Sequence, residues 1–266
     1  MKIIFLGTSS GVGKTAIAAM FCRYLRKRNV NVVPFKALNL SSSSYVTKDS
    51  EIGIGQALQA AASDLEPMTD MNPVLLKYSN NGIKTLAHGK IVSVDDRKEL
   101  LNIALESYDK LSEKYEAVVA EGSGSPAEIN LSKKDIANIG LARERNIPAV
   151  LIGDIERGGV FAGLYGTWKL IDKNDRHLLK GFMINRFRGD PTILKKGTDK
   201  ITELTGMKFL GVMPLIDIRL PEEDALSFKD DRMGEMKDYL NGLDEFVSSA
   251  EENLDLDSIV KLMSST

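Results

Sequence analysis

The chain has 266 residues, of which 43% are hydrophobic, and this is enough apolar material for one large α/β domain or two small ones. Lysine and arginine (35) nearly balance aspartate and glutamate (37), so a net charge of −2 argues against a nucleic-acid partner. Cys22 is the single cysteine and the N-terminus lacks the pattern of a secretory signal, so we expect a cytoplasmic protein without disulfides. No apolar run approaches the roughly 18 residues that span a bilayer, so we expect no membrane partner.

Short β-rich runs alternate along the chain with longer stretches of helical periodicity. This alternation predicts an α/β fold of the doubly wound type, in which a mostly parallel sheet is flanked by helices. Strands are predicted at residues 2–6, 31–35, 117–120, 149–153, 181–185 and 209–213. Helices are predicted over residues 14–28, 52–62, 96–114, 136–145, 163–170 and 190–205. We expect one domain over residues 1–236, and an acidic linker with one C-terminal helix over residues 237–266.

A glycine-rich turn joins the first predicted strand to the first predicted helix, and it ends in Gly13-Lys14-Thr15, as phosphate-binding loops do. In such a loop, backbone N–H groups bind phosphate, the lysine reaches the β- and γ-phosphates, and the threonine hydroxyl holds Mg²⁺. The usual pattern GxxxxGK[ST] would begin with glycine at position 8, whereas this chain has Thr8 there and Gly7 before it. The alternative is a glycine turn that binds no nucleotide. The residues expected to bind ATP in this loop are Thr8, Ser9, Gly11, Val12, Gly13, Lys14 and Thr15.

Charged residues follow the second and third predicted strands, at the end of the sheet where open parallel sheets bind ligands. Lys36 would neutralise a substrate carboxylate or a transferring phosphoryl group, and the alternative is a solvent-exposed lysine. Glu121 would coordinate Mg²⁺ opposite Thr15, and the alternative is a helix cap or an exposed side chain. Asp135 stands where a helix should begin, so capping and catalysis are equally open for it.

Polar residues also follow the fourth and fifth predicted strands. Asp154 and Arg157 precede a glycine pair, so this segment would wrap a substrate or the γ-phosphate, or else the two side chains form an ion pair in a turn. Asn185 offers a donor and an acceptor that would read a purine edge. Cys22 lies among apolar residues of the first helix and is interpreted as a small core side chain. The sequence has no Cys/His cluster with the spacing of a zinc site.

Several longer strings resemble the synthetase domain of cobyric acid synthase. The most specific are DMNPVLLK at residues 70–77 and SPAEINL at residues 125–131, and the resemblance spans about residues 1 to 228. The other strings that carry it lie at residues 7–15, 34–37, 51–53, 121–124, 154–161 and 220–224. The wider superfamily includes dethiobiotin synthetase and cobyrinic acid a,c-diamide synthase, which share the shifted phosphate loop.

The resemblance implies an ATP-dependent amidation of corrinoid side-chain carboxylates. ATP would phosphorylate a carboxylate, and ammonia would displace phosphate from the resulting acyl phosphate, so catalysis would depend on positioning and charge neutralisation. The site residues that the resemblance implies are Lys14, Lys36 and Asp135 for catalysis, Asn185 for adenine, and Thr15, Glu51 and Glu121 for Mg²⁺. Glu51 is the weaker of the metal candidates.

One departure from the family concerns the source of ammonia. The usual chain continues into a glutaminase domain with a nucleophilic cysteine and a histidine, whereas this sequence ends at Thr266 and carries only Cys22. We expect ammonia to come from solution or from a separate glutaminase subunit. Because related synthetases form dimers, we also expect a homodimer.

Three alternatives to the amide ligase stay open. A dethiobiotin synthetase-type carboxylase and cyclase would share the fold, but the strings at residues 70–77 and 125–131 argue against it. A partitioning-type ATPase typically has an additional lysine early in its loop, where this chain has Thr8, Ser9 and Ser10. A regulatory module without turnover is the third alternative, and intact Lys14 and Thr15 argue against it.

Overall fold

The computed structural model describes residues 1–41, 44–48, 50–79, 82–93, 96–130, 135–216 and 232–264. The chain forms two compact units. Unit 1 comprises Met1–Lys14, Gly122–Asp217 and Ser248–Thr266, and unit 2 comprises Thr15–Glu121 and Ile218–Val247. The string at residues 220–224 and Leu131 lie outside the described residues.

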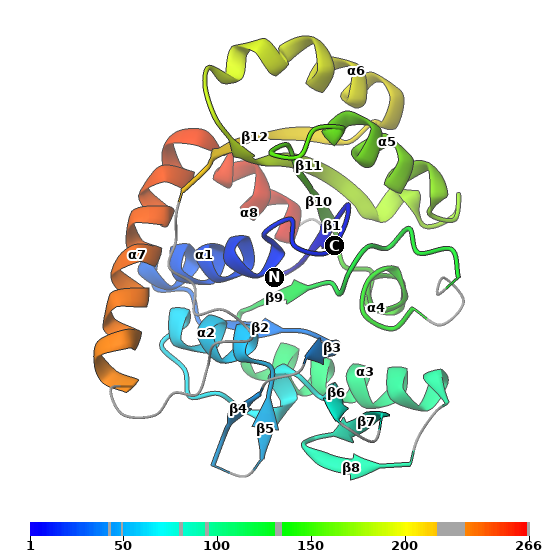
Figure 1. The fold of residues 1–266 in the computed structure, drawn as a ribbon, viewed down its shortest axis with the longest axis vertical. Helices are drawn as coiled ribbons and strands as arrows, with labels where there is room; N and C mark the ends of the chain where they lie inside the picture. The colour runs from blue at the N-terminus through cyan, green and yellow to red at the C-terminus, as the bar shows by residue number, and fades with distance from the viewer. Residues whose placement is uncertain are drawn as a thin grey trace. The chain divides into compact units, whose positions relative to one another are not determined.

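Unit 1 is built on parallel strands in the order β12-β11-β10-β1 (Figure 1). Its strands are β1 (Lys2–Gly7), β10 (Ala149–Asp154), β11 (Leu179–Phe187) and β12 (Lys208–Pro214). Residues 3–6 and 149–152 are fully buried, as expected for parallel strands covered on both faces. Helices α5 (Val160–Leu170) and α6 (Lys195–Thr205) lie on one side of these strands, and α8 (Leu256–Ser264) lies on the other. The unit also contains α4 (Ile139–Arg145) and the short helices η3 (Arg176–Leu178) and η4 (Pro191–Leu194).

Unit 2 contains a parallel strand pair and a second, mixed sheet. The parallel pair is β2 (Val32–Phe35) with β9 (Ala117–Glu121). The mixed sheet has the order β3-β6-β7-β8, in which β3 and β6 are parallel and the other pairs antiparallel. Its strands are β3 (Leu38–Ser41), β6 (Val74–Ser79), β7 (Gly82–Ala87) and β8 (Lys90–Val92). The remaining elements are α1 (Lys14–Lys27), α2 (Ile54–Ala62), α3 (Arg97–Lys114), η1 (Thr69–Met71), and β4 (Tyr45–Val46) paired with β5 (Glu51–Ile52).

The predicted fold class, a doubly wound α/β fold with mostly parallel strands and flanking helices, is confirmed. Each of the six predicted strands is present within two residues of its expected bounds. The helix predicted from residue 136 begins at Ile139, because Asp135 binds the backbone amides of the residues before it. The helix predicted from residue 190 begins as η4, where Pro191 follows the capping side chain of Asp190.

The C-terminal tail differs from the expected linker and single helix. A long helix, α7 (Arg232–Asn253), covers most of the stretch expected as a linker, and α8 follows it. Tyr239, Leu243 and Phe246 are buried at helical spacing along α7, and this burial accounts for the helix. The boundary predicted at residues 236/237 falls inside α7, and the division into domains there stays a prediction.

None of the helices among the described residues is both long and apolar enough to cross a bilayer.

Candidate nucleotide and metal site

The predicted phosphate loop follows β1 in unit 1. Its first amide is anchored, because the Thr8 N–H donates to the Ile152 carbonyl at 3.0 Å. Gly11 and Gly13 have φ angles of 75° and 95°, in the left-handed region that glycine adopts without strain. A Cβ at position 13 would also lie 2.3 Å from Nδ2 of Asn185, so this position requires glycine for space as well as for conformation.

The shifted first glycine has a packing reason. A Cβ at Gly7 would lie 2.6 Å from Cγ2 of Val12 and 2.9 Å from Nζ of Lys14. The Val12 side chain is buried, so its predicted role in nucleotide binding would fall to its backbone. Gly7 therefore lets the loop close over the end of β1.

Lys14 is held close to the loop that it terminates. Its side chain is 6% exposed, and its ammonium donates to the carbonyl oxygens of Ser9 at 3.0 Å and Gly124 at 2.9 Å. These carbonyls keep the charge next to the amides that would bind phosphate. Ser9 thus contributes its carbonyl here, while its hydroxyl donates to the carbonyl of Ser10.

Asn185, at the end of the buried part of β11, supports the phosphate loop. Its Nδ2 donates to the Val12 carbonyl at 2.8 Å, and the side chain is buried. Its contact with adenine stays a prediction. Arg186, the next residue, forms an ion pair with Asp154 at 2.9 Å. The predicted alternative, an ion pair between Asp154 and Arg157, is therefore wrong.

In unit 2 the carboxylate of Glu121 lies at the centre of a buried polar cluster. Its Oε1 accepts a hydrogen bond from the Thr15 hydroxyl at 2.8 Å and pairs with the Lys36 ammonium at 2.9 Å. Glu121 is 1% exposed and Lys36 is 6% exposed, which excludes a solvent-exposed position for either side chain. The structure thus brings together three predicted site residues that come from distant segments of the sequence.

Two glutamines of α2 complete this cluster, and sequence reasoning missed both. Gln59 donates to Oε2 of Glu121 at 2.7 Å, and Gln56 donates to the same oxygen at 3.2 Å. They stand three residues apart and so project from one face of the helix. The signal was two polar residues within an otherwise apolar helix, since such residues are buried only with partners.

Asn72 is a second residue that sequence reasoning did not select. Its side-chain amide donates to the carbonyls of Lys36 and Val74, at 3.0 and 3.1 Å, and its Oδ1 accepts from the Gly53 amide at 3.0 Å. Asn72 therefore ties the backbone that carries Lys36 to the residue before α2. The string at residues 70–77 thus includes a residue that links two segments of unit 2.

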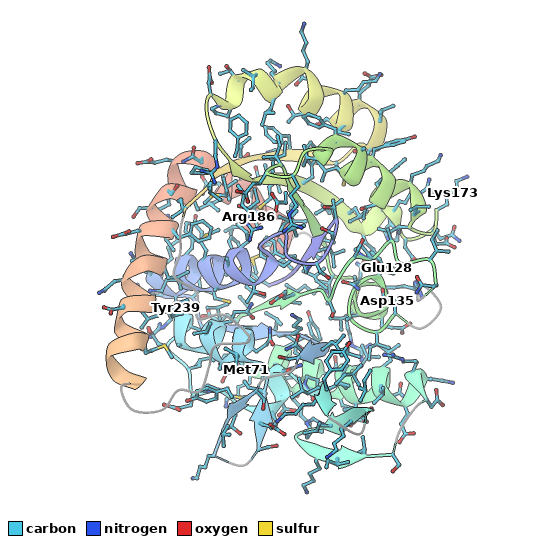
Figure 2. All side chains as sticks on the ribbon, in the orientation of Figure 1. Met71, Glu128, Asp135, Lys173, Arg186 and Tyr239 are labelled. Carbon is cyan, nitrogen blue, oxygen red and sulfur yellow. The ribbon has the colours of Figure 1, made fainter. Side chains whose placement is uncertain are left out.

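Asp135 precedes α4 in unit 1, as Figure 2 shows. Its carboxylate accepts hydrogen bonds from the backbone amides of Ala137, Asn138 and Gly140 at 3.1, 2.9 and 3.2 Å. These bonds favour the capping interpretation. A catalytic role for Asp135 stays a prediction.

Glu51, the weaker metal candidate, has other partners. Its Oε2 accepts from the Lys77 ammonium at 2.6 Å and from the Ser44 hydroxyl. Burial would raise the pKa of Glu51, but these hydrogen bonds and the charge of Lys77 outweigh it and lower the pKa. The structure joins Glu51 to the string at residues 70–77 and not to Thr15.

The residues present fit a magnesium ion. Thr15 and Glu121 supply a hydroxyl and a carboxylate, which are the oxygen ligands that Mg²⁺ prefers. No group of three or more histidine, cysteine, aspartate or glutamate side chains suited to a metal occurs in the part of the chain that the structure describes. This is compatible with Mg²⁺, which usually takes one or two carboxylates, water and substrate phosphates.

A phosphate loop that follows a buried parallel strand, in an α/β fold flanked by helices, defines a nucleotide-binding protein of the P-loop class. More narrowly, the chain belongs to the family of CobQ/CobB/MinD/ParA nucleotide binding domains, which it matches over residues 3–227.

Curated relatives confirm the resemblance to cobyric acid synthase. A "Probable cobyric acid synthase" of Methanosphaerula palustris is 47% identical over 239 residues, which cover 86% of this chain and 49% of the relative. A "Cobyric acid synthase" of Cutibacterium acnes is 47% identical over 234 residues, which cover 84% and 48%. The chain therefore spans about half the length of the curated relatives it matches. Among solved structures, the signal recognition particle 54 kDa protein of Aeropyrum pernix with GDP has a TM-score of 0.48 at 16% identity, covering 94% of this chain and 50% of that one.

Proposed function

We propose that this chain is an ATP-dependent amide ligase that acts on the side-chain carboxylates of a corrinoid, as its relatives' name suggests. The observation that carries the proposal is the buried cluster of Thr15, Lys36 and Glu121, in which Thr15 directly follows the phosphate-loop lysine Lys14. Such a cluster offers oxygen ligands for Mg²⁺ and a cation for a transferring phosphoryl group. The corresponding products are cobyric acid, ADP and phosphate.

The proposed reaction has two steps. A substrate carboxylate oxygen attacks the γ-phosphorus of ATP, and ADP leaves. Ammonia then attacks the acyl carbon, inorganic phosphate leaves with the former carboxylate oxygen, and the nitrogen loses a proton. The first step needs in-line positioning and charge neutralisation, and Mg²⁺ held by Thr15 and Glu121 would supply part of the charge neutralisation.

The chain's own residues have separate roles in this proposal. Lys14 binds the β- and γ-phosphates, and Lys36 neutralises charge on the transferring group. Thr15 and Glu121 hold Mg²⁺, with Glu51 as a further candidate. In the same proposal, Asn185 contacts adenine while its amide supports the loop, and Asp135 orders the segment that receives the acyl phosphate.

Ammonia comes from solution or from a separate glutaminase subunit in this proposal. Cys22, the single cysteine of the sequence, is fully buried, and burial raises the pKa of its thiol to about 12. A thiol in this environment is not the thiolate that attacks glutamine. A homodimer remains part of the proposal.

The test is incubation of the purified chain with ATP, Mg²⁺, ammonium and cobyrinic acid a,c-diamide, followed by mass spectrometry. Each amidation replaces a hydroxyl by an amino group, so the number of modified carboxylates is read from the product mass. The Lys14→Ala variant is the negative control, and circular dichroism checks that it is folded. ATP turnover stimulated by a diaminononanoate with CO₂ would contradict the proposal in favour of the dethiobiotin-type alternative. ATP turnover stimulated by neither the diaminononanoate nor cobyrinic acid a,c-diamide would contradict it in favour of the switch alternative.

A further inference from the structure

Two glutamines of α2 bind the metal-ligand candidate Glu121 through one oxygen only. Both Nε2 atoms reach Oε2, at 2.7 Å for Gln59 and 3.2 Å for Gln56. The other oxygen, Oε1, faces the Thr15 hydroxyl and the Lys36 ammonium. The two carboxylate oxygens therefore have different partners.

The orientation of the two glutamine amides follows from this arrangement. An ionised carboxylate only accepts hydrogen bonds, so each amide must present its nitrogen to Glu121. Each Oε1 then points away, and among the described residues neither Oε1 has a hydrogen-bond partner although both side chains are fully buried. Buried polar atoms without partners are uncommon and costly, so this arrangement calls for a reason beyond packing.

The same helix is also closely fitted to Thr15. Nε2 of Gln59 lies 3.3 Å from the Thr15 carbonyl oxygen, so one amide contacts both residues that would bind the metal. A Cβ at Gly55 would lie 2.8 Å from Cγ2 of Thr15, so glycine at this position lets α2 approach. The helix thus supports the hydroxyl and the carboxylate together.

We propose that Gln56 and Gln59 are positioning residues for the metal site, which fix Oε2 of Glu121 so that Oε1 is the oxygen presented to Mg²⁺ beside Thr15. This inference rests on the proposed function to the extent that the site binds Mg²⁺ with ATP. Loss of a partner that orients a ligating side chain typically lowers metal affinity or activity by about 10–100-fold. Without the amides, the Thr15 hydroxyl and the Lys36 ammonium, both on Oε1, would be left to hold the carboxylate against rotation about its last bond.

The test uses Gln56→Met and Gln59→Met, singly and together, because methionine has a similar length and no amide. Leu58→Met, at a buried apolar position of the same helix, is the matched control. Binding of Mn²⁺ in the presence of ATP is measured by the electron paramagnetic resonance of the free ion, and binding of ATP alone is measured in EDTA. We expect metal affinity to fall about 10–100-fold in the glutamine variants, while the control and the metal-free ATP affinity stay within about twofold of wild type.

A kinetic measurement separates positioning from a structural role. The Mg²⁺ concentration for half-maximal ATP turnover should rise by about the same factor as the loss of affinity, about 10–100-fold, with the plateau rate largely kept. Normal metal affinity in folded variants would overturn the proposal. If the Gln59→Met variant does not fold, the metal affinity of Gln56→Met decides the test. A wild-type protein that binds no Mn²⁺ with ATP would instead overturn the proposed function, and the glutamine role with it.

Discussion

The buried ion pair between Lys36 and Glu121 allows a quantitative test of how the site is built. Lys36→Met removes the ammonium but keeps most of the apolar stem. Glu121 would keep the donors Thr15, Gln56 and Gln59, yet lose the ammonium of Lys36 in a position that is 1% exposed. Breaking a buried pair from one side typically costs about 3–5 kcal/mol, and the three remaining donors place this case near about 3 kcal/mol.

Urea unfolding followed by circular dichroism measures this loss. Lys77→Met is the matched control, because Lys77 and its partner Glu51 are 32% and 24% exposed and such a pair contributes only about 0.2–1 kcal/mol. Adding Glu121→Gln to Lys36→Met should recover part of the stability, since the unpaired charge is then removed. If Lys36→Met costs no more than Lys77→Met, the argument from a buried charge is refuted.

Three further predictions concern the loop, the thiol and the C-terminal helix. Gly13→Ala should weaken ATP binding at least about tenfold by calorimetry, because its φ of 95° is strained for alanine and Cβ would meet a buried amide 2.3 Å away; wild-type affinity would contradict this. Glutamine as sole nitrogen source should give no product, because burial raises the pKa of Cys22 to about 12; amide formed from glutamine in a purified sample would contradict it. Hydrogen bonds from Ser258 and Lys208 lower the pKa of Asp255 to about 2 in the folded protein. The ionised carboxylate therefore contributes its full stabilisation of the fold above the pKa of aspartate in the unfolded chain, about 4, and loses it as the pH falls to about 2. The melting temperature of Asp255→Asn should therefore lie below that of wild type at pH 6 and meet it at low pH, and a constant difference would exclude this cause.

The sequence sufficed to predict the features that depend on local patterns. The strand, glycine turn and Gly13-Lys14-Thr15 are contiguous, so their local geometry could be read directly. The packing reason for the shifted glycine at position 7 came only from the structure. Lys36 and Glu121 were selected because each ends a buried strand, and their burial agrees with that reasoning. Position along a strand therefore carries much of the information about this site.

The mixed sheet of unit 2 was missed because lysines break up the apolar pattern of its strands. Lys77, Lys84 and Lys90 interrupt the apolar alternation of β6, β7 and β8. The sequence nevertheless carried a signal, the glycine of His88-Gly89. In the structure these residues have φ angles of 45° and 70°, as a two-residue turn between antiparallel strands requires. The Asn-Asn-Gly sequence at residues 80–82 is a hairpin signal of the same kind.

The partners of Glu121 show why a site of this kind exceeds what one sequence reveals. Four hydrogen-bond donors to it among the described residues come from the start of α1, the residue after β2 and one face of α2. Taken alone, a glutamine in an apolar helix indicates only that a partner must exist, because burial without one is costly. The partner is fixed by tertiary contacts across more than 60 residues of sequence, as the separation of 62 between Gln59 and Glu121 shows. The choice of Glu121 as a candidate metal ligand follows from its residue type, whereas the positioning of its carboxylate depends on contacts that only the fold provides.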